Sequence, residues 1–193
     1  MILVIDNYDS FVNNLARYVR EAGRETIVLR NDAATVAECL EMKPEGVIIS
    51  PGPKSPADAG ISLDLLRALD ACTPLLGVCL GHQCLVEVFG GVTCRAGHPL
   101  HGEASEIWHD GSGIFTGVPS PMMAARYHSL ISVPAATGPM SCTAWSLDGE
   151  LMAVTHKERP WFGVQFHPES LLTPHGRKLI ENFLTLCGRG CVL

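Results

Sequence analysis

The first ninety residues alternate short apolar runs with segments of helical periodicity, and this alternation limits the possible fold more than any other feature. The apolar runs predict buried strands at residues 2–5, 25–29, 46–49 and 75–78. Apolar residues at helical spacing predict helices at 11–22, 61–71 and 81–89. Thr35 and Glu38 form a capping-box pattern that opens a shorter helix. Buried strands separated by helices predict a parallel sheet that is covered on both faces.

After Gly91 the pattern changes to short alternating segments, such as 105–108 and 124–128, separated by turns rich in Gly and Pro. Asp148-Gly149 lies between two strand-like runs, 142–147 and 150–156, and predicts a hairpin. A buried strand at 161–166 and a closing helix at 174–186 follow. We therefore expect an α/β fold with an open, mostly parallel twisted sheet and a smaller antiparallel extension, in one domain covering residues 1–193.

The charge balance and the start of the chain exclude two classes of function. A net charge of -6 without any run of Lys or Arg argues against a general nucleic-acid binder. The chain also has neither a basic leader nor an apolar stretch long enough to cross a membrane. These features predict a cytoplasmic protein that contacts neither nucleic acid nor membrane.

A cysteine stands where the strand predicted at 75–78 meets the helix predicted at 81–89. A sharp strand-to-helix turn there would expose the Cys79 sulfur at the carboxyl edge of the sheet, above a helix amino terminus. Free backbone N–H groups and the helix dipole favour a thiolate in such a position. The same geometry presents the serine of the Gly-x-Ser-x-Gly elbow in hydrolases. Cys79 is therefore the candidate nucleophile.

His167 is the histidine best placed to act as base and acid for this thiol. It follows the strand-like run 163–166, and functional groups of a parallel sheet collect at the carboxyl ends of strands. Pro168 keeps the chain extended, so a period of two places Glu169 on the same side as His167. Glu169 would then orient the imidazole, the third role of a triad. Taken alone, these residues also fit a strand end followed by a polar turn.

Acyl chemistry further needs N–H donors for a developing oxyanion, and two segments offer them. One donor is the N–H of Leu80, next to the nucleophile. The other is Gly52, the sole N–H donor within Pro51-Gly52-Pro53. Read in isolation, the proline-flanked glycine is simply a rigid turn.

Together these segments resemble the class I glutamine amidotransferases, which carry a Cys-His-Glu triad. Residues 77–83 match the nucleophile segment of that family, and residues 167–169 match its His-x-Glu segment. Further motifs resemble the glutaminase subunits of anthranilate synthase and 4-amino-4-deoxychorismate synthase: Asp6-Asn7-Tyr8-Asp9-Ser10-Phe11, Ser50-Pro51-Gly52-Pro53 and Tyr127-His128-Ser129-Leu130. The resemblance extends from Met1 to the closing helix.

The resemblance implies a flavodoxin-like fold and a glutaminase reaction. Cys79 would attack the side-chain amide of glutamine, His167 would release ammonia, and Glu169 would complete the triad. The resemblance also implies that Gln83 and the backbone of Ser129 and Leu130 bind the α-amino and α-carboxyl groups of glutamine.

A partner is implied as well, namely a chorismate-binding synthase subunit (component I) that receives the ammonia. Its product would be anthranilate for tryptophan synthesis, or 4-amino-4-deoxychorismate for folate synthesis, or both. The family pattern places no metal and no organic cofactor on this chain, and Mg²⁺ is expected on the partner.

One segment departs from the family pattern, and two other classes of function remain open. His101-Gly102-Glu103 stands where the family commonly has His-Gly-Lys. The charge reversal at Glu103 puts partner contacts of this stretch in doubt, and His101 fits an interface or a solvated loop equally well. A redox-sensing thiol protein would also place a cysteine on an elbow, and a noncatalytic regulatory subunit would keep the fold, although such a subunit is expected to lose part of the triad.

Overall fold

The computed structural model describes residues 1–97, 99–100 and 102–188, so His101 lies outside the described residues. The strands are β1 (Ile2–Asp6), β2 (Thr26–Arg30), β3 (Gly46–Ile49), β4 (Leu75–Val78), β5 (Val92–Arg95), β6 (Glu103–His109), β7 (Met122–Arg126), β8 (Leu130–Val133), β9 (Met140–Ser146), β10 (Leu151–His156) and β11 (Trp161–Val164). The helices are α1 (Val12–Glu21), α2 (Val36–Glu41), α3 (Ser62–Ala68), α4 (Leu80–Val88) and α5 (Gly176–Leu184), with short 3-10 turns η1 (Pro56–Asp58) and η2 (Gly113–Phe115).

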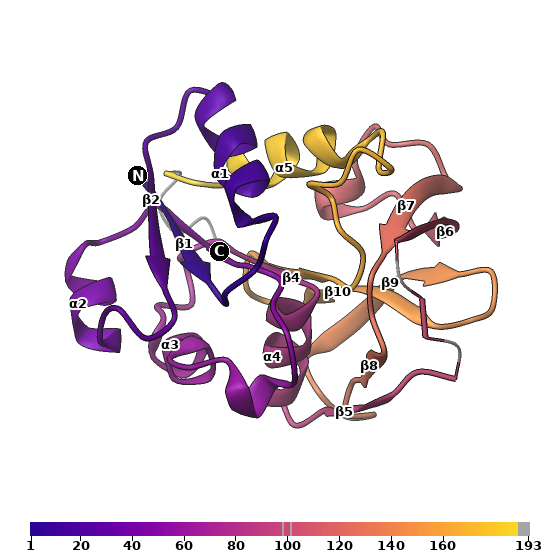
Figure 1. The fold of residues 1–193 in the computed structure, drawn as a ribbon, viewed down its shortest axis with the longest axis horizontal. Coiled ribbons are helices and arrows are strands. Elements are labelled where there is room, and N and C mark those ends of the chain that lie inside the picture. The colour runs from indigo at the N-terminus through magenta and orange to yellow at the C-terminus, as the bar shows by residue number, and fades with distance from the viewer. Residues whose placement is uncertain (98, 101, 189–193) are drawn as a thin grey trace.

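Within the described residues, one large sheet has the strand order β2-β1-β3-β4-β11-β10-β9-β6-β7. The strands from β2 to β11 are parallel, and β10, β9, β6 and β7 continue the sheet in antiparallel pairing. Figure 1 shows the two parts side by side, with the antiparallel strands on the right. The mostly parallel α/β sheet with an antiparallel extension is therefore confirmed.

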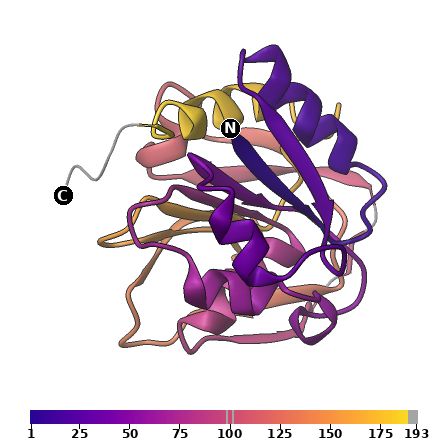
Figure 2. The same ribbon diagram turned by 90° about the vertical axis from the view of Figure 1, so that its left-hand side faces the viewer.

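Helices cover the parallel strands on both faces (Figure 2), and the alternation of side chains along β1 shows why. Ile2 and Val4 point to one face, into a core shared with α1 and α5. Leu3 and Ile5 point to the other face, into a core shared with α2, α3 and α4. Because all four side chains are fully buried, a continuous apolar run is required, as the sequence predicted.

Most predicted elements are present with small shifts at their ends, but one pair of strands was missed. The capping box forms as expected: the Glu38 N–H donates to the Thr35 hydroxyl at 3.3 Å, and the Thr35 N–H donates to the Glu38 carboxylate at 2.7 Å. The missed strands, β5 and β8, form a separate two-stranded sheet. They are short and lie far apart in the sequence, so no local hairpin signal connects them.

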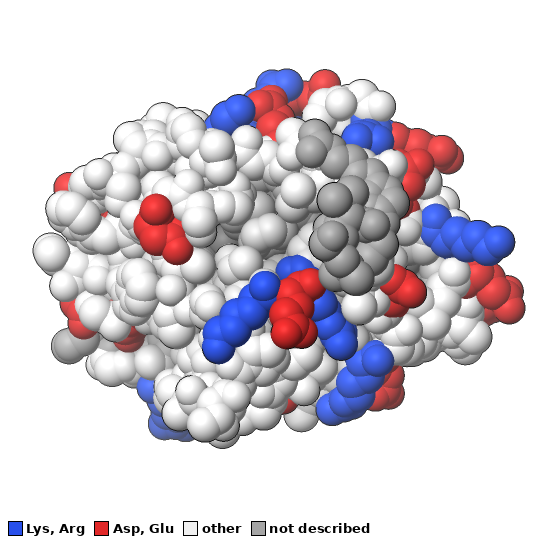
Figure 3. Space-filling view, turned by 180° about the vertical axis from the view of Figure 1, so that it is seen from behind, with Lys and Arg blue, Asp and Glu red and all other residues white. Residues whose placement is uncertain are grey.

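The surface opposite to the view of Figure 1 carries mixed charges (Figure 3). Basic and acidic side chains stand next to one another there, and a broad area over the antiparallel strands is nearly free of charge. Among the described residues, no helix combines the length and the apolar character needed to cross a membrane.

Candidate active site

Cys79 lies in the turn between β4 and α4, as predicted, and its backbone is strained. Its φ of 50° and ψ of -100° place a non-glycine residue in the left-handed half of conformational space. Its N–H donates to the carbonyl of Val164 at 2.8 Å, which ties the turn to β11. Tyr8 and Lys54, in the loops after β1 and β3, also have positive φ values, of 61° and 69°. Strain of about 1–3 kcal/mol per residue is typical of functional sites. Of the four non-glycine residues with positive φ in the described chain, all except Lys43 lie at the carboxyl edge of the parallel strands.

The elbow depends on the close approach of α4 to β3 at Gly81. A Cβ atom on Gly81 would lie 2.3 Å from the carbonyl oxygen of Ile49. Real Cβ contacts are longer than this, and both partners are backbone, so no side chain can move to relieve the clash. The glycine therefore sets the distance between the nucleophile turn and the neighbouring strand.

We expect Gly81→Ala to displace the amino terminus of α4 and to lower turnover of the expected substrate, glutamine, at least about a hundredfold, because shifts of 1 Å have effects of that size on reacting groups. Overpacking of this kind also lowers the free energy of unfolding by roughly 1–3 kcal/mol. Steady-state kinetics and urea unfolding would measure both effects. Wild-type turnover in a folded Gly81→Ala protein would contradict the required close approach.

The structure brings His167 and Glu169 together beyond the end of β11. The Nδ1 atom of His167 lies 2.5 Å from Oε1 of Glu169, and both side chains are buried. The His167 N–H donates to the carbonyl of Ala125 at 2.9 Å. The Thr173 hydroxyl donates to the His167 carbonyl at 2.7 Å and accepts from the Ala125 N–H at 3.0 Å. These backbone bonds hold the histidine at a fixed position above the sheet.

Cys79 faces the other nitrogen of the imidazole. Burial alone would lower the pKa of His167, but hydrogen bonding to Cys79 and Glu169, together with their charges, holds that pKa well above 6.5. Because Nδ1 is taken by Glu169, the interaction with Cys79 uses Nε2. That buried atom makes no hydrogen bond of regular geometry within the described residues, so it is available for the proton of the thiol.

Glu169→Gln should lower the pKa of His167, because the amide removes a negative charge while the burial that disfavours the imidazolium remains. Imidazole proton NMR would follow the titration. We expect turnover to fall less than in His167→Ala, where loss of the acid and base lowers it by about 10²–10⁴-fold. An unchanged His167 titration in Glu169→Gln would contradict the assigned pairing.

The two predicted oxyanion donors are neighbours in the structure. A Cβ atom on Gly52 would lie 2.6 Å from Asn7 Cβ and 2.9 Å from Leu80 Cδ2, so the glycine fits tightly between these residues. Leu80 is the first residue of α4, where the N–H has no acceptor inside the helix. Gly52 therefore lies against Leu80, the residue that follows Cys79, at the same edge of the sheet.

A buried polar network holds the Gly52 loop in place, and Asn7 is its centre. The Asn7 backbone N–H donates to the Ser50 hydroxyl at 2.9 Å, and its side-chain NH₂ donates to the Ser50 carbonyl at 3.0 Å. Its Oδ1 accepts from Asn31 and from Ser62, both at 3.0 Å. Asn7 thus connects the ends of β1, β2 and β3 to α3, and it positions the loop that carries Gly52.

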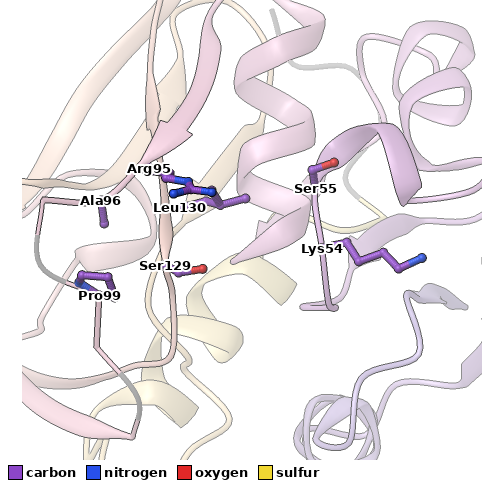
Figure 4. A pocket seen from close by; sticks show the side chains of 7 residues that line it. All are labelled: Lys54, Ser55, Arg95, Ala96, Pro99, Ser129 and Leu130. Carbon is purple, nitrogen blue, oxygen red and sulfur yellow. The ribbon is translucent and has the colours of Figure 1, made fainter.

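The residues expected to bind glutamine also lie together. The Gln83 side-chain nitrogen donates to the Leu130 carbonyl at 3.3 Å. Ser129 and Leu130 line an open groove of about 460 Å³. Figure 4 shows Lys54 and Ser55 on one side of this groove, with Ser129, Leu130 and Arg95 on the other.

Comparison with known proteins assigns the family. The model of the family "Glutamine amidotransferase class-I" matches residues 3–187. The chain belongs to the class I glutamine amidotransferases. The nucleophile segment and the His-x-Glu segment both fall within this match, and Cys79, His167 and Glu169 lie at one edge of the parallel sheet of this amidotransferase.

Relatives and solved structures agree with that assignment. Anthranilate synthase component 2 of Azospirillum brasilense is 50% identical over 192 residues, covering 98% of this chain and 97% of the relative. Aminodeoxychorismate/anthranilate synthase component 2 of Bacillus subtilis (strain 168) is 50% identical over 187 residues, covering 95% of each chain. The crystal structure of a protein from Thermoplasma acidophilum, assigned as one subunit of a GMP synthase, superposes with a TM-score of 0.87 at 27% identity and covers 96% of this chain and 92% of its own.

Gln165 and Arg126 are site residues that the sequence reasoning missed. Gln165 is fully buried, and its side-chain nitrogen lies 3.5 Å from the Cys79 sulfur. A signal for it existed, because a polar residue in the apolar run 163–166 shares the two-residue period of His167 and Glu169.

Arg126 has no such signal in the sequence. Its buried guanidinium donates to His128 at 3.2 Å and to Asp148 at 3.3 Å, and it also pairs with Glu150. These contacts connect the tip of the β9–β10 hairpin to the segment that carries Ser129. Arg126 therefore supports the side of the groove that Ser129 and Leu130 line.

Two buried neutral histidines predict that this amidotransferase is labile to acid. Burial lowers the pKa of His82 to about 3 and that of His128 to about 4. The unfolded chain titrates these groups near 6.5, so it binds more protons than the folded chain between those values. Stability should therefore fall as the pH drops from about 6.5 toward 4, by up to roughly 2.7 kcal/mol per pH unit for two protons.

Urea unfolding across this pH range measures the slope, and His82→Leu is the matched variant. Among the described residues the ring nitrogens of His82 meet only the Gly163 backbone, at a geometry short of a regular hydrogen bond, so leucine removes one titration without breaking an ion pair. We expect about half the slope in this variant, and an identical slope would refute the assignment. Above pH 6.5 the raised pKa of His167 acts in the other direction, since its contribution is complete below 6.5 and is lost as the pH rises through the folded pKa.

Proposed function

We propose that this chain is the glutaminase component of a two-component synthase that uses chorismate. It hydrolyses glutamine to glutamate and ammonia, and the ammonia passes to a chorismate-binding subunit that makes anthranilate. The observation that carries the proposal is the arrangement of Cys79, His167 and Glu169 beside the amides of Gly52 and Leu80. A cytoplasmic location fits this role.

The chemistry follows from the positions of these groups. The Cys79 sulfur attacks the side-chain amide carbon of glutamine, and the amides of Gly52 and Leu80 donate to the oxygen that becomes negative. His167, protonated and oriented by Glu169, gives its proton to the departing nitrogen, which releases ammonia. His167 then takes a proton from water, which hydrolyses the thioester and frees glutamate.

The α-ammonium and α-carboxylate groups of glutamine need different partners, a hydrogen-bond acceptor for the first and donors or positive charge for the second. The two N–H bonds of the Gln83 amide point to the Leu130 carbonyl and to Gln165, so its oxygen is left to accept from an α-ammonium group. The α-carboxylate would lie toward Ser129 and Leu130. Nearby Lys54 and Arg95 favour an anion in the groove through their charge.

The destination of the ammonia has a second candidate. The Bacillus subtilis relative is named for both aminodeoxychorismate and anthranilate synthase, so one such component serves two products there. We propose anthranilate as the main product of this system and 4-amino-4-deoxychorismate as the alternative. No cofactor is proposed for this chain, and any Mg²⁺ requirement would belong to the chorismate-binding subunit.

Reconstitution with each chorismate-binding subunit of the source organism tests this proposal. Glutamate release and product formation would be followed together, with glutamine or with ammonium as nitrogen donor. We expect glutamine to support anthranilate formation only when both components are present. Absence of glutamine-dependent product with every such subunit would reject the proposal, whereas formation of 4-amino-4-deoxychorismate alone would select the alternative.

A further inference from the structure

Gln165 connects the nucleophile to the segment that binds glutamine. Its side-chain oxygen accepts from the Gln83 amide at 3.2 Å, and its side-chain nitrogen lies 3.5 Å from the Cys79 sulfur. The side chain is fully buried, and its backbone N–H donates to the Met152 carbonyl at 2.9 Å. A chain of three hydrogen bonds therefore runs from Leu130 through Gln83 and Gln165 to Cys79.

The direction of this hydrogen-bond chain is set by a group that cannot turn around. The Leu130 carbonyl can only accept, so the Gln83 atom that faces it must be the NH₂ group. The same NH₂ faces Gln165, which must therefore present its oxygen. The remaining atom of the Gln165 amide is its NH₂ group, and that group faces the sulfur. The hydrogen-bond chain therefore ends with a donor directed at Cys79.

We propose that Gln165 is a further catalytic residue, whose amide N–H donates to the Cys79 sulfur and stabilises it as a thiolate, while its oxygen fixes Gln83 in the orientation that accepts the α-ammonium group of glutamine. A donor held against sulfur favours the charged acceptor over the neutral thiol. Hydrogen bonds in a chain also polarise one another in a buried site. Binding of glutamine at the Gln83 oxygen therefore acts on the same chain that ends at the nucleophile.

The role of Gln165 in glutamine binding rests on the proposed function, whereas its role at the sulfur does not. The sulfur can be probed without glutamine, by alkylation with iodoacetamide as a function of pH. Cys94 and Cys142 are exposed and will also react, so modification of Cys79 should be quantified by peptide mass spectrometry. The alkylation midpoint then reports on the thiolate at this one position.

Three variants separate an electrostatic role from a role in packing. Gln165→Met keeps a similar length without a donor, and Gln165→Glu keeps the shape but places a negative oxygen at the sulfur. We expect the Cys79 alkylation midpoint to rise by about one pH unit in Gln165→Met, and further in Gln165→Glu. His82→Leu, a buried change on the same helix as the nucleophile turn, should leave the midpoint unchanged.

The order of the variants decides the outcome. If Gln165 acted through packing alone, Gln165→Glu would be milder than Gln165→Met, because glutamate is closest in shape to glutamine. Equal alkylation midpoints in wild type, Gln165→Met and Gln165→Glu would overturn the proposal. In kinetics, Gln165→Met should lower kcat/KM for glutamine at least about tenfold, with the lower kcat recovering as the pH rises. Shifted midpoints in a chain that releases no glutamate would reject the proposed function but support the contact between Gln165 and the sulfur. Normal glutamate release by wild type together with unshifted midpoints in the Gln165 variants would support the proposed function and reject that contact.

Discussion

Cys79→Ala should abolish glutamine-dependent synthesis while the partner continues to make product from ammonium. Without the sulfur no thioester forms, and removal of the nucleophile of a triad lowers turnover by roughly 10⁶-fold in a serine hydrolase. We expect a loss of at least about 10⁴-fold in glutamate release. The measurement is a glutamate assay on the reconstituted complex, paired with product formation from ammonium.

The ammonium reaction is the control for assembly. Loss of both activities in Cys79→Ala would mean that the residue is structural or that the subunits no longer associate. Equal glutamate release by wild type and Cys79→Ser would reject Cys79 as the nucleophile.

Cys79→Gly provides a matched variant that isolates the strain of the elbow. Cys79→Ala keeps a Cβ atom at φ 50°, whereas glycine adopts this conformation readily. The glycine variant should be equally inactive yet more stable to urea than the alanine variant, by about 1 kcal/mol or more. A less stable glycine variant would show that the turn is not strained at this residue.

Arg126→Met should produce the largest loss of stability among the changes considered. The guanidinium is buried between Glu150, Asp148 and His128, and its removal leaves the nearly buried Glu150 carboxylate without its cation. Breaking a buried ion pair on one side lowers the free energy of unfolding by about 3–5 kcal/mol. Urea unfolding at neutral pH measures this loss.

Glu150→Gln combined with Arg126→Met is the test of mechanism. The double variant no longer buries an unpaired charge, so it should regain part of the stability lost in Arg126→Met. A loss below about 1 kcal/mol in the single variant would contradict the buried pair. Because Arg126 also supports the segment before Ser129, the KM for glutamine should rise in the folded fraction.

How far the sequence predicts the site differs from residue to residue. Cys79 and His167 were predictable, because each follows an apolar strand-like run and the carboxyl ends of such strands meet at one edge of a parallel sheet. Glu169 followed from its spacing of two residues from His167. Gly52 and Leu80 followed from the absence of N–H groups on the prolines and from the start of a helix. Gln83, Ser129 and Leu130 were reached only through the family resemblance, since nothing in their spacing indicates a ligand.

The strands β5 and β8 and the contacts of Arg126 show where prediction from sequence ended. Val92–Arg95 pairs with Leu130–Val133, and Arg126 contacts residues more than twenty positions away. Pairings of this kind depend on how the whole chain packs, and a short segment does not specify its distant partner.

The sequence by itself determined the parallel strands, the helices on both faces and the elbow that presents Cys79, because these depend on periodicity, glycine placement and strand ends that are local in the chain. Only the tertiary structure decided the direction of the hydrogen-bond chain from Leu130 to the Cys79 sulfur and the burial of Arg126. The physical reason is that hydrogen-bond direction and desolvation depend on groups from distant segments of the chain. Folding alone brings these groups together.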